Sequence, residues 1–144
     1  MYREKIKGVI TPILTPMKGD GSLYEEELRR QIGRQLAGGV HGIFTAGTNG
    51  EGYILSAQEK ERILEIAIEE VQGRVPVYAG TGCISTAETI YLSRRAQDMG
   101  ADVLSVITPS FAQASQEELY EHYRAVATAV KIPVVLYNIP ARTG

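Results

Sequence analysis

The sequence holds one cysteine, two histidines and no tryptophan among its 144 residues. The single cysteine, Cys83, excludes an internal disulfide framework and a four-cysteine metal site, which favours a reducing cytoplasm. Neither His41 nor His122 falls in the loops that hold the other polar residues, so we interpret both as structural or surface residues. With so few ligand-type side chains in those loops, we expect no metal site.

The sequence also lacks a large excess of charge of either sign. The net charge is −2, so no basic surface favours nucleic acid or an anionic membrane as a partner. The first ten residues, MYREKIKGVI, have no long apolar run behind their charges. We therefore expect neither a signal peptide nor a membrane span, and small molecules and like protein chains remain as partners.

Hydrophobic residues make up 44% of the sequence, which is enough for one packed domain or part of a larger one. A serine followed three residues later by a glutamate recurs four times, and each pair predicts a capping box at a helix start. Apolar residues at spacings of three and four follow each pair, which indicates four one-sided helices. The pairs are Ser22 with Glu25, Ser56 with Glu59, Ser85 with Glu88, and Ser115 with Glu118.

Short apolar runs separate the expected helices, and they do not alternate with polar residues. Such runs predict a parallel sheet whose strands are buried on both faces. The pattern gives five strands and four helices, and it fits either an open doubly wound sheet or part of an eightfold barrel. The runs are Val9 to Leu14, Val40 to Ala46, Val75 to Ala79, Val103 to Ile107 and Val134 to Tyr137.

In both architectures the site forms from the loops after the carboxyl ends of the strands. The loop Gly47 to Glu51, GTNGE, offers a hydroxyl, an amide and free backbone N–H groups, which suits a carboxylate. The alternative is a tight turn that needs glycine torsions. The loop at Gly80, GTG, lacks the third glycine of a dinucleotide fingerprint because Ser85 stands there, so we expect no nucleotide cofactor.

The stretch Val134 to Gly144, VVLYNIPARTG, reads as a buried strand that ends in a polar, proline-stiffened turn. Tyr137 and Arg142 lie where the strand ends. Each has a structural alternative, since a tyrosine ring can fill a core and an arginine can be a solvated loop charge. Their placement at the same end of the sheet as Thr48 favours a ligand site.

These loops together resemble the dihydrodipicolinate synthase and N-acetylneuraminate lyase family over essentially the whole chain. The resemblance implies a (β/α)8 TIM barrel, with residues 1–144 as the N-terminal part of a single domain. It also implies a lyase: a class I aldolase that binds pyruvate or another 2-oxo acid as a Schiff base, without a cofactor. The matching motifs are TPILTP (11–16), GTNGE (47–51), TPSF (108–111), SQEELYEHY (115–123) and YNIPARTG (137–144).

By the same resemblance, Thr48 helps to bind the pyruvate carboxylate and joins a proton relay. Tyr137 resembles the acid/base phenol, and Arg142 resembles the entrance residue that meets a substrate carboxylate. Asn49 stands where the synthases usually carry a second hydroxyl, although its amide can still donate to a carboxylate. Phe111 stands where they place a tyrosine that reaches a neighbouring subunit. The resemblance thus implies a homo-oligomer, and the two departures favour a substrate other than that of the true synthases.

The Schiff-base lysine of the family is expected on the sixth strand, beyond Gly144. No lysine of the chain follows the end of an expected strand in a way that suits this role, so the 144 residues alone are expected to be inactive. The alternative is a non-catalytic half-barrel that self-associates through its open edge strands. The five lysines are Lys5, Lys7, Lys18, Lys60 and Lys131.

Overall fold

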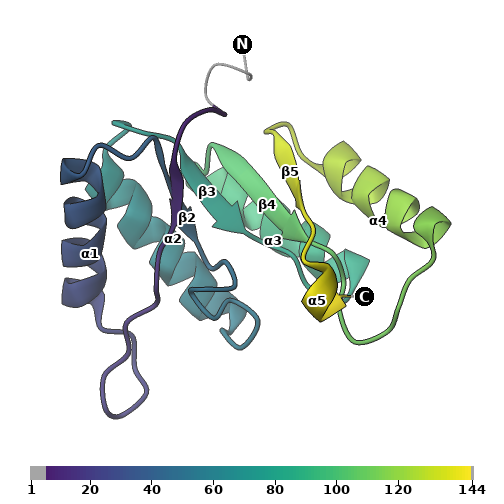
Figure 1. The fold of residues 1–144 in the computed structure, drawn as a ribbon, viewed down its shortest axis with the longest axis horizontal. Coiled ribbons are helices and arrows are strands. Elements are labelled where there is room, and N and C mark those ends of the chain that lie inside the picture. Colours follow the sequence, from purple (N-terminus) through teal and green to yellow (C-terminus); the bar gives the residue numbers. More distant parts are fainter. Residues whose placement is uncertain (1–5, 144) are drawn as a thin grey trace.

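The structure is a computed structural model, and it describes residues 6–143, so Lys5 and Gly144 lie outside the described residues. Five strands alternate with four long helices, and a short fifth helix follows the last strand (Figure 1). The strands are β1 Ile10–Pro12, β2 Gly42–Thr45, β3 Val77–Gly80, β4 Val103–Ile107 and β5 Val134–Tyr137. The helices are α1 Glu25–Ala37, α2 Ala57–Val71, α3 Thr86–Met99, α4 Gln116–Ala129 and α5 Pro140–Thr143.

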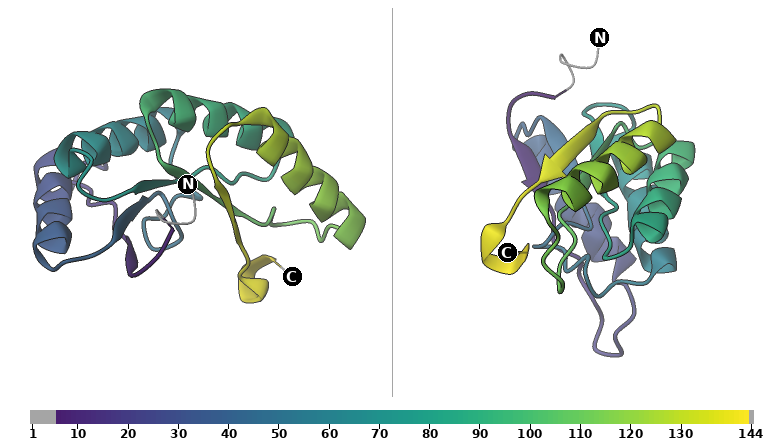
Figure 2. Two further views of the ribbon diagram at one scale, coloured as in Figure 1. Left: turned by 90° about the horizontal axis from the view of Figure 1, so that it is seen from above. Right: turned by 90° about the vertical axis from the view of Figure 1, so that its right-hand side faces the viewer.

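The strands form one parallel sheet in the order β1-β2-β3-β4-β5. Helices α1 to α4 all lie along the convex face of this curved sheet, as the view from above shows (Figure 2). A doubly wound sheet reverses its strand order and carries helices on both faces, whereas a barrel winds in one direction with its helices outside. The structure therefore corresponds to part of a barrel.

The core lies between the convex face of the sheet and the helices. Ile43, Val77 and Leu104 point from neighbouring strands into this layer, where they meet apolar residues of α1 and α2 such as Ile32 and Ile63. Each of these five side chains is at most 3% exposed. Since burying such a side chain contributes about 1.5–3 kcal/mol, this layer is the main source of stability in the half-barrel.

Two of the four expected capping boxes form as predicted, at Ser56 and Ser115. The prediction for Ser22 is wrong, because its hydroxyl donates to the Asp20 carboxylate at 2.7 Å and α1 begins later, at Glu25. At Ser85 only half of the box forms: the Ser85 oxygen accepts the Glu88 N–H at 3.1 Å, but the Ser85 N–H does not donate to the Glu88 carboxylate.

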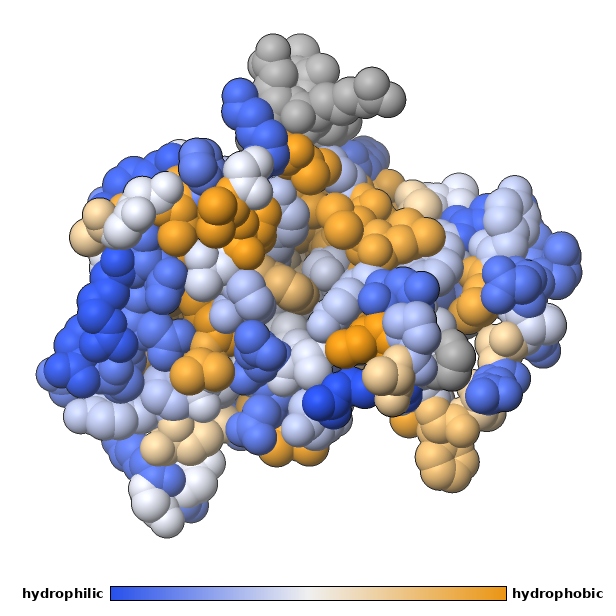
Figure 3. Space-filling view, in the orientation of Figure 1, coloured by the Kyte–Doolittle hydropathy of each residue, from blue (hydrophilic) through white to orange (hydrophobic). Residues whose placement is uncertain are grey.

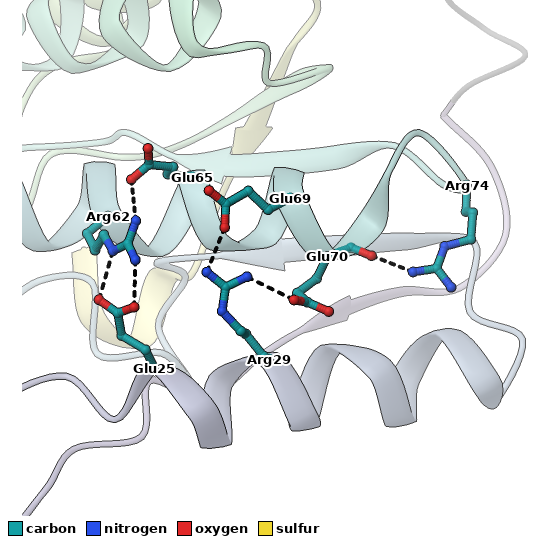
Figure 4. Close-up of polar contacts among 7 residues, drawn as sticks. All are labelled: Glu25, Arg29, Arg62, Glu65, Glu69, Glu70 and Arg74. Carbon is teal, nitrogen blue, oxygen red and sulfur yellow. Dashed lines mark hydrogen bonds and ion pairs between the residues drawn. The ribbon is translucent and has the colours of Figure 1, made fainter.

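A network of ion pairs joins α1 to α2 on the outer surface (Figure 4). The Arg62 guanidinium donates to both oxygens of Glu25, at 2.8 and 2.6 Å, and to Glu65 at 2.6 Å. Arg29 donates in the same way to Glu69 and Glu70. Because Arg62 holds the carboxylate of Glu25, the pKa of Glu25 lies below its ordinary value.

The concave face of the sheet is open, and apolar residues in orange gather over its strands between patches of polar residues (Figure 3). The edge strand β5 also exposes Leu136, which is 61% accessible. Its side chain lies on the same face of the sheet as that of the half-buried Val134, which packs against the core, so a further element packed beside β5 would cover it. None of the helices within residues 6–143 combines the length and the apolar character that a bilayer-spanning helix needs.

Candidate active site

The loop after β2 begins with a strained residue, Ala46, whose φ of 52° lies in the left-handed region. Two glycines make room for its carbonyl oxygen. A Cβ atom at Gly52 would lie 2.0 Å from the Ala46 oxygen, and one at Gly80 would lie 2.4 Å from it. Residues in this conformation cost energy unless their surroundings fix them. The close glycine contacts therefore hold the turn that carries Thr48 over the end of the sheet.

The Thr48 hydroxyl lies 3.1 Å from the Tyr137 phenol oxygen, and either group can donate. Tyr137 is the last residue of β5, and its ring meets the Phe44 ring edge-on, with centroids 6.4 Å apart. Its backbone oxygen accepts the Thr108 N–H at 3.1 Å. Contacts to β2 and to the end of β4 thus fix the phenol from two sides, which leaves its O–H available to exchange a proton with a ligand.

Arg142 lies on α5, where the sequence predicted a turn rather than a helix. The short helix is closed by the Arg142 N–H, which donates to the Ile139 oxygen at 2.8 Å, and by the buried Thr143. Arg142 lines a cavity of about 400 Å³ together with Thr48 and Tyr137. Asn49, the fourth predicted site residue, is exposed and lies outside the lining of this cavity.

The cavity therefore joins three of the four predicted residues, from the loop after β2, from β5 and from α5. A guanidinium recognises a carboxylate through two parallel hydrogen bonds. A hydroxyl in contact with a phenol can pass a proton along the pair. The arrangement is suited to holding a small carboxylic acid while a proton moves to or from it.

Sequence reasoning missed the wall that α2 and α3 contribute to this cavity. Lys60 stands in the first turn of α2, and its ammonium donates to the Cys83 sulfur at 3.9 Å. Glu88, in the first turn of α3, lines the same wall. The signal was available, because the helices of a βα unit begin at the end of the sheet where the strands finish, so first-turn side chains can reach the site.

The two histidines lie away from this arrangement. His41 accepts the Val9 N–H on its Nδ1 atom at 3.1 Å, just before β2 begins, at the opposite end of the sheet. His122 is buried between α3 and α4, where its Nδ1 atom lies 2.9 Å from the Thr86 hydroxyl. Within residues 6–143, no three histidine, cysteine, aspartate or glutamate side chains gather closely enough to hold a metal ion.

Comparison with known proteins finds one family and many similar chains. The Dihydrodipicolinate synthetase family matches residues 5–144. A 4-hydroxy-tetrahydrodipicolinate synthase of Pelobacter propionicus is 50% identical over 138 residues, which is 96% of this chain and 47% of that protein. One from Methanopyrus kandleri is 45% identical over 97% of this chain and 47% of its own length.

Solved structures agree with these relatives. The chloride-inhibited dihydrodipicolinate synthase of Acinetobacter baumannii, complexed with pyruvate, has a TM-score of 0.94 at 40% identity, and the match covers 96% of this chain and 48% of that one. A prophage protein of the dihydrodipicolinic acid synthase family from E. coli K12, also in complex with pyruvate, has a TM-score of 0.93 at 40% identity, over 96% and 47% of the two chains.

The chain thus spans about half the length of the relatives and structures that it matches. Its five parallel strands and outer helices superpose on the corresponding part of those TIM barrels, so the expected fold class is confirmed. Both the family match and the structural similarity extend over nearly every residue, including the loops that line the cavity. The chain belongs to the dihydrodipicolinate synthetase family.

Proposed function

We propose that the protein containing this chain is a Schiff-base lyase that forms or cleaves a carbon–carbon bond between pyruvate and an aldehyde. The observation that carries the proposal is the 3.1 Å contact between Thr48 and Tyr137 in the cavity that Arg142 also lines. The two related structures complexed with pyruvate support it.

Each of the four residues has a role in this proposal. Thr48 donates to the pyruvate carboxylate, and Arg142 meets a carboxylate at the entrance of the cavity. Asn49, which lies outside the lining, follows Thr48 in the same loop and has the role of a second donor to the pyruvate carboxylate from the rim. An iminium formed from pyruvate and a lysine draws electrons from the adjacent carbon, so a bond to that carbon can form or break. Tyr137, paired with the Thr48 hydroxyl, then moves the proton that this step requires. The chemistry needs no metal and no organic cofactor.

The lysine is the part of the mechanism that we assign outside these 144 residues, on the strand that follows β5 in the family. In the proposal this chain alone does not capture pyruvate. The test is to incubate it, and a version extended through the remaining strands, with pyruvate and borohydride, and then to measure the intact mass. An adduct on the extended protein alone is expected. An extended protein that never captures pyruvate would contradict the proposal.

The substrate that we propose is a 2-oxo acid other than that of the true synthases, such as a 2-keto-3-deoxy sugar acid or 4-hydroxy-2-oxoglutarate. Asn49 and Phe111 support this, because neither supplies the hydroxyl that the synthases use. Assays of the extended protein, with pyruvate plus aspartate semialdehyde in one arm and cleavage of the two oxo acids in the other, distinguish the activities. Faster condensation with aspartate semialdehyde would overturn the substrate choice and keep the reaction class.

We propose further that the protein is a cytoplasmic homo-oligomer. Phe111 is 99% exposed and its φ of 81° is rare for a residue with a side chain. A fully exposed ring on a strained turn is stable when another surface covers it, and the family resemblance makes a second subunit the partner. Light scattering of the extended protein and of Phe111→Asp tests this. Equal masses would contradict a role for Phe111 in assembly.

A second candidate applies to the 144 residues alone: a non-catalytic half-barrel that self-associates. In the described part of the chain, β1 and β5 each pair with one neighbour, and Leu136 on β5 is 61% exposed. Unpaired edges and exposed apolar residues favour association between copies. A monodisperse monomer of this chain would count against the candidate.

A further inference from the structure

The cavity has a cluster of reactive side chains that the proposed reaction does not use. Lys60, Cys83 and Glu88 all line it, on the wall made by α2, by the loop between β3 and α3, and by the first turn of α3. The Lys60 nitrogen lies 3.9 Å from the Cys83 sulfur. The Glu88 carboxylate lines the same wall, and burial together with this carboxylate raises the pKa of the Cys83 thiol. A lysine nitrogen and a thiol are thus in reach of each other, with a carboxylate on the same wall of the cavity.

The lysine in this cluster is directed at sulfur rather than at a counter-ion. Among residues 6–143, no carboxylate lies within ion-pair distance of the Lys60 ammonium, in contrast with the paired Arg62 two positions along the same helix. Lys60 is partly buried, so its position is more restricted than that of a lysine in open solvent. A nitrogen held beside sulfur has a high effective concentration for attack on it.

Cys83 is the only cysteine among these 144 residues, so an oxidised Cys83 finds no second thiol within them. Its side chain is half-buried and faces a cavity of about 400 Å³, which admits a molecule as small as hydrogen peroxide. Oxidised sulfur reacts with the nearest nucleophile, and nitrogen can take the place of a thiol in that step. Lys60 supplies such a nitrogen.

We propose that Lys60 and Cys83 form a modification site, at which a hydroperoxide oxidises the thiol and the lysine nitrogen then bonds to the sulfur. In the first step the Cys83 sulfur takes an oxygen from the peroxide, which gives a sulfenic acid and one water. In the second step the unprotonated Lys60 nitrogen attacks the sulfur, the S–O bond breaks, and a second water leaves. The product is an S–N bond, and the peroxide is the oxidant for the two electrons removed.

The surroundings set the pH dependence of this reaction. Burial and the Glu88 carboxylate raise the pKa of the Cys83 thiol, and the Lys60 ammonium opposes them without cancelling their effect. The thiolate, which reacts with peroxide, therefore forms at higher pH than in an exposed cysteine. The lysine must also lose its proton before it attacks. Both requirements make the cross-link form faster as the pH rises above neutrality.

The cross-link would connect two separate parts of the fold. It would tie the first turn of α2 to the loop that precedes α3, and it would remove the positive charge of Lys60 from the cavity. The site does not depend on the proposed lyase activity, since neither residue belongs to the Thr48, Tyr137 and Arg142 group. It can therefore be tested on the 144-residue chain.

The experiment treats the chain with hydrogen peroxide at mildly alkaline pH, digests it without reductant and identifies the peptides by mass spectrometry. The expected product joins a peptide of α2 to the peptide that holds Cys83, with a mass lower by two hydrogen atoms than the sum of the two, and dithiothreitol reverses it. Lys60→Arg and Cys83→Ser abolish the product. Lys18→Arg, a matched change at another lysine, leaves its yield unchanged.

Three outcomes would overturn the inference. The first is a sulfenic acid that dimedone traps as efficiently in the unchanged chain as in Lys60→Arg. The second is conversion of Cys83 to sulfinic acid at the same rate in both proteins, since a lysine that captures the sulfenic acid must slow this reaction. The third is a linked product that retains one added oxygen, which would place oxygen between the nitrogen and the sulfur and exclude the direct bond.

Discussion

The Thr48 hydroxyl and the Tyr137 phenol lie 3.1 Å apart although 89 positions separate the two residues in the sequence. The contact spans the cavity from the loop after β2 to the end of β5. It exists because parallel strands finish at the same edge of the sheet, so residues just beyond two different strands meet there. Neither residue reaches the other without the intervening β3 and β4, which set the spacing between β2 and β5.

The first prediction concerns this pair in a protein extended to the full barrel. Tyr137→Phe removes the phenolic proton and keeps the ring against Phe44, so we expect kcat to fall by about 100-fold or more, the usual contribution of a positioned acid or base. Tyr123→Phe is the matched control. Its phenol bonds the nearby Thr108 hydroxyl at 3.1 Å and lies outside the cavity lining. A similar loss of kcat in both variants would refute the proposed role of Tyr137.

The site was only partly predictable from the sequence, for a physical reason. Thr48, Tyr137 and Arg142 were predictable because each follows a strand, and the carboxyl ends of parallel strands share one edge. Lys60 was not found, because its place in the first turn shows only that it can reach the site. Whether it does so depends on the direction of its side chain, which follows from how far the helix has turned. The same limit applies to Ser22, whose spacing to Glu25 fits a capping box but whose hydroxyl finds the closer carboxylate of Asp20.

The choice between an open sheet and a barrel could not be made from the apolar pattern either. Strands such as Val103–Ile107 are apolar at nearly every position in both architectures, because both bury the two faces of each strand. What distinguishes them is the side on which each helix crosses, and that follows from packing among α1 to α4. The observed strand order decides in favour of the barrel.

The second prediction tests the glycine contact behind the strained turn. Gly80→Ala would place a Cβ atom 2.4 Å from the Ala46 oxygen, which is backbone and cannot rotate away. We expect a loss of about 1–3 kcal/mol in the free energy of unfolding, as for other overpacked sites. Gly33→Ala is the control, because nothing lies within 4 Å of the added atom and Gly33 is inside α1. It should stabilise the protein by about 0.5–1 kcal/mol. Urea titration measures both changes, and a neutral Gly80→Ala would exclude the contact as a constraint.

The third prediction separates the helix-covered layer from the open edge. Leu104 on β4 is fully buried against the helices, so Leu104→Ala should lower the free energy of unfolding by about 2–5 kcal/mol. Leu136 on the neighbouring β5 is 61% exposed, so Leu136→Ala should change it by no more than about 0.5 kcal/mol in the isolated chain. Chemical denaturation of both variants provides the measurement. A large loss at Leu136 would mean that another copy covers it in solution.

The fourth prediction concerns the ion pairs between α1 and α2. Side chains of Arg62 and Glu25 are 39% and 42% exposed, so solvent screens their attraction. We expect Arg62→Gln to cost no more than about 1 kcal/mol, and the cost to shrink in concentrated salt. Arg124→Gln should cost less, because within the described part of the chain the Arg124 guanidinium pairs only with Glu121 inside α4. Thermal unfolding at low and high salt tests this, and equal, salt-independent costs would refute a helix-joining role.

The last prediction is a pH dependence that originates at His122. Burial between α3 and α4 lowers the pKa of this imidazole, and its Nε2 atom has no hydrogen-bond partner among residues 6–143 to stabilise a proton. The unfolded chain therefore binds a proton more readily than the folded one. As the pH falls through the ordinary histidine pKa of about 6.5, the folded state loses stability relative to the unfolded state. The loss levels off once the pH passes below the lowered folded-state pKa.

Denaturant unfolding of the unchanged chain and of His122→Gln, each followed from pH 8 to about pH 5, measures this effect. The glutamine can keep an acceptor near the Thr86 hydroxyl, which lies 2.9 Å from Nδ1, and it carries no titrating group. The difference in stability between the two proteins should narrow as the pH falls, because only the histidine loses stability by protonation. A constant difference across this range would mean that the folded protein accepts the proton as readily as the unfolded chain does.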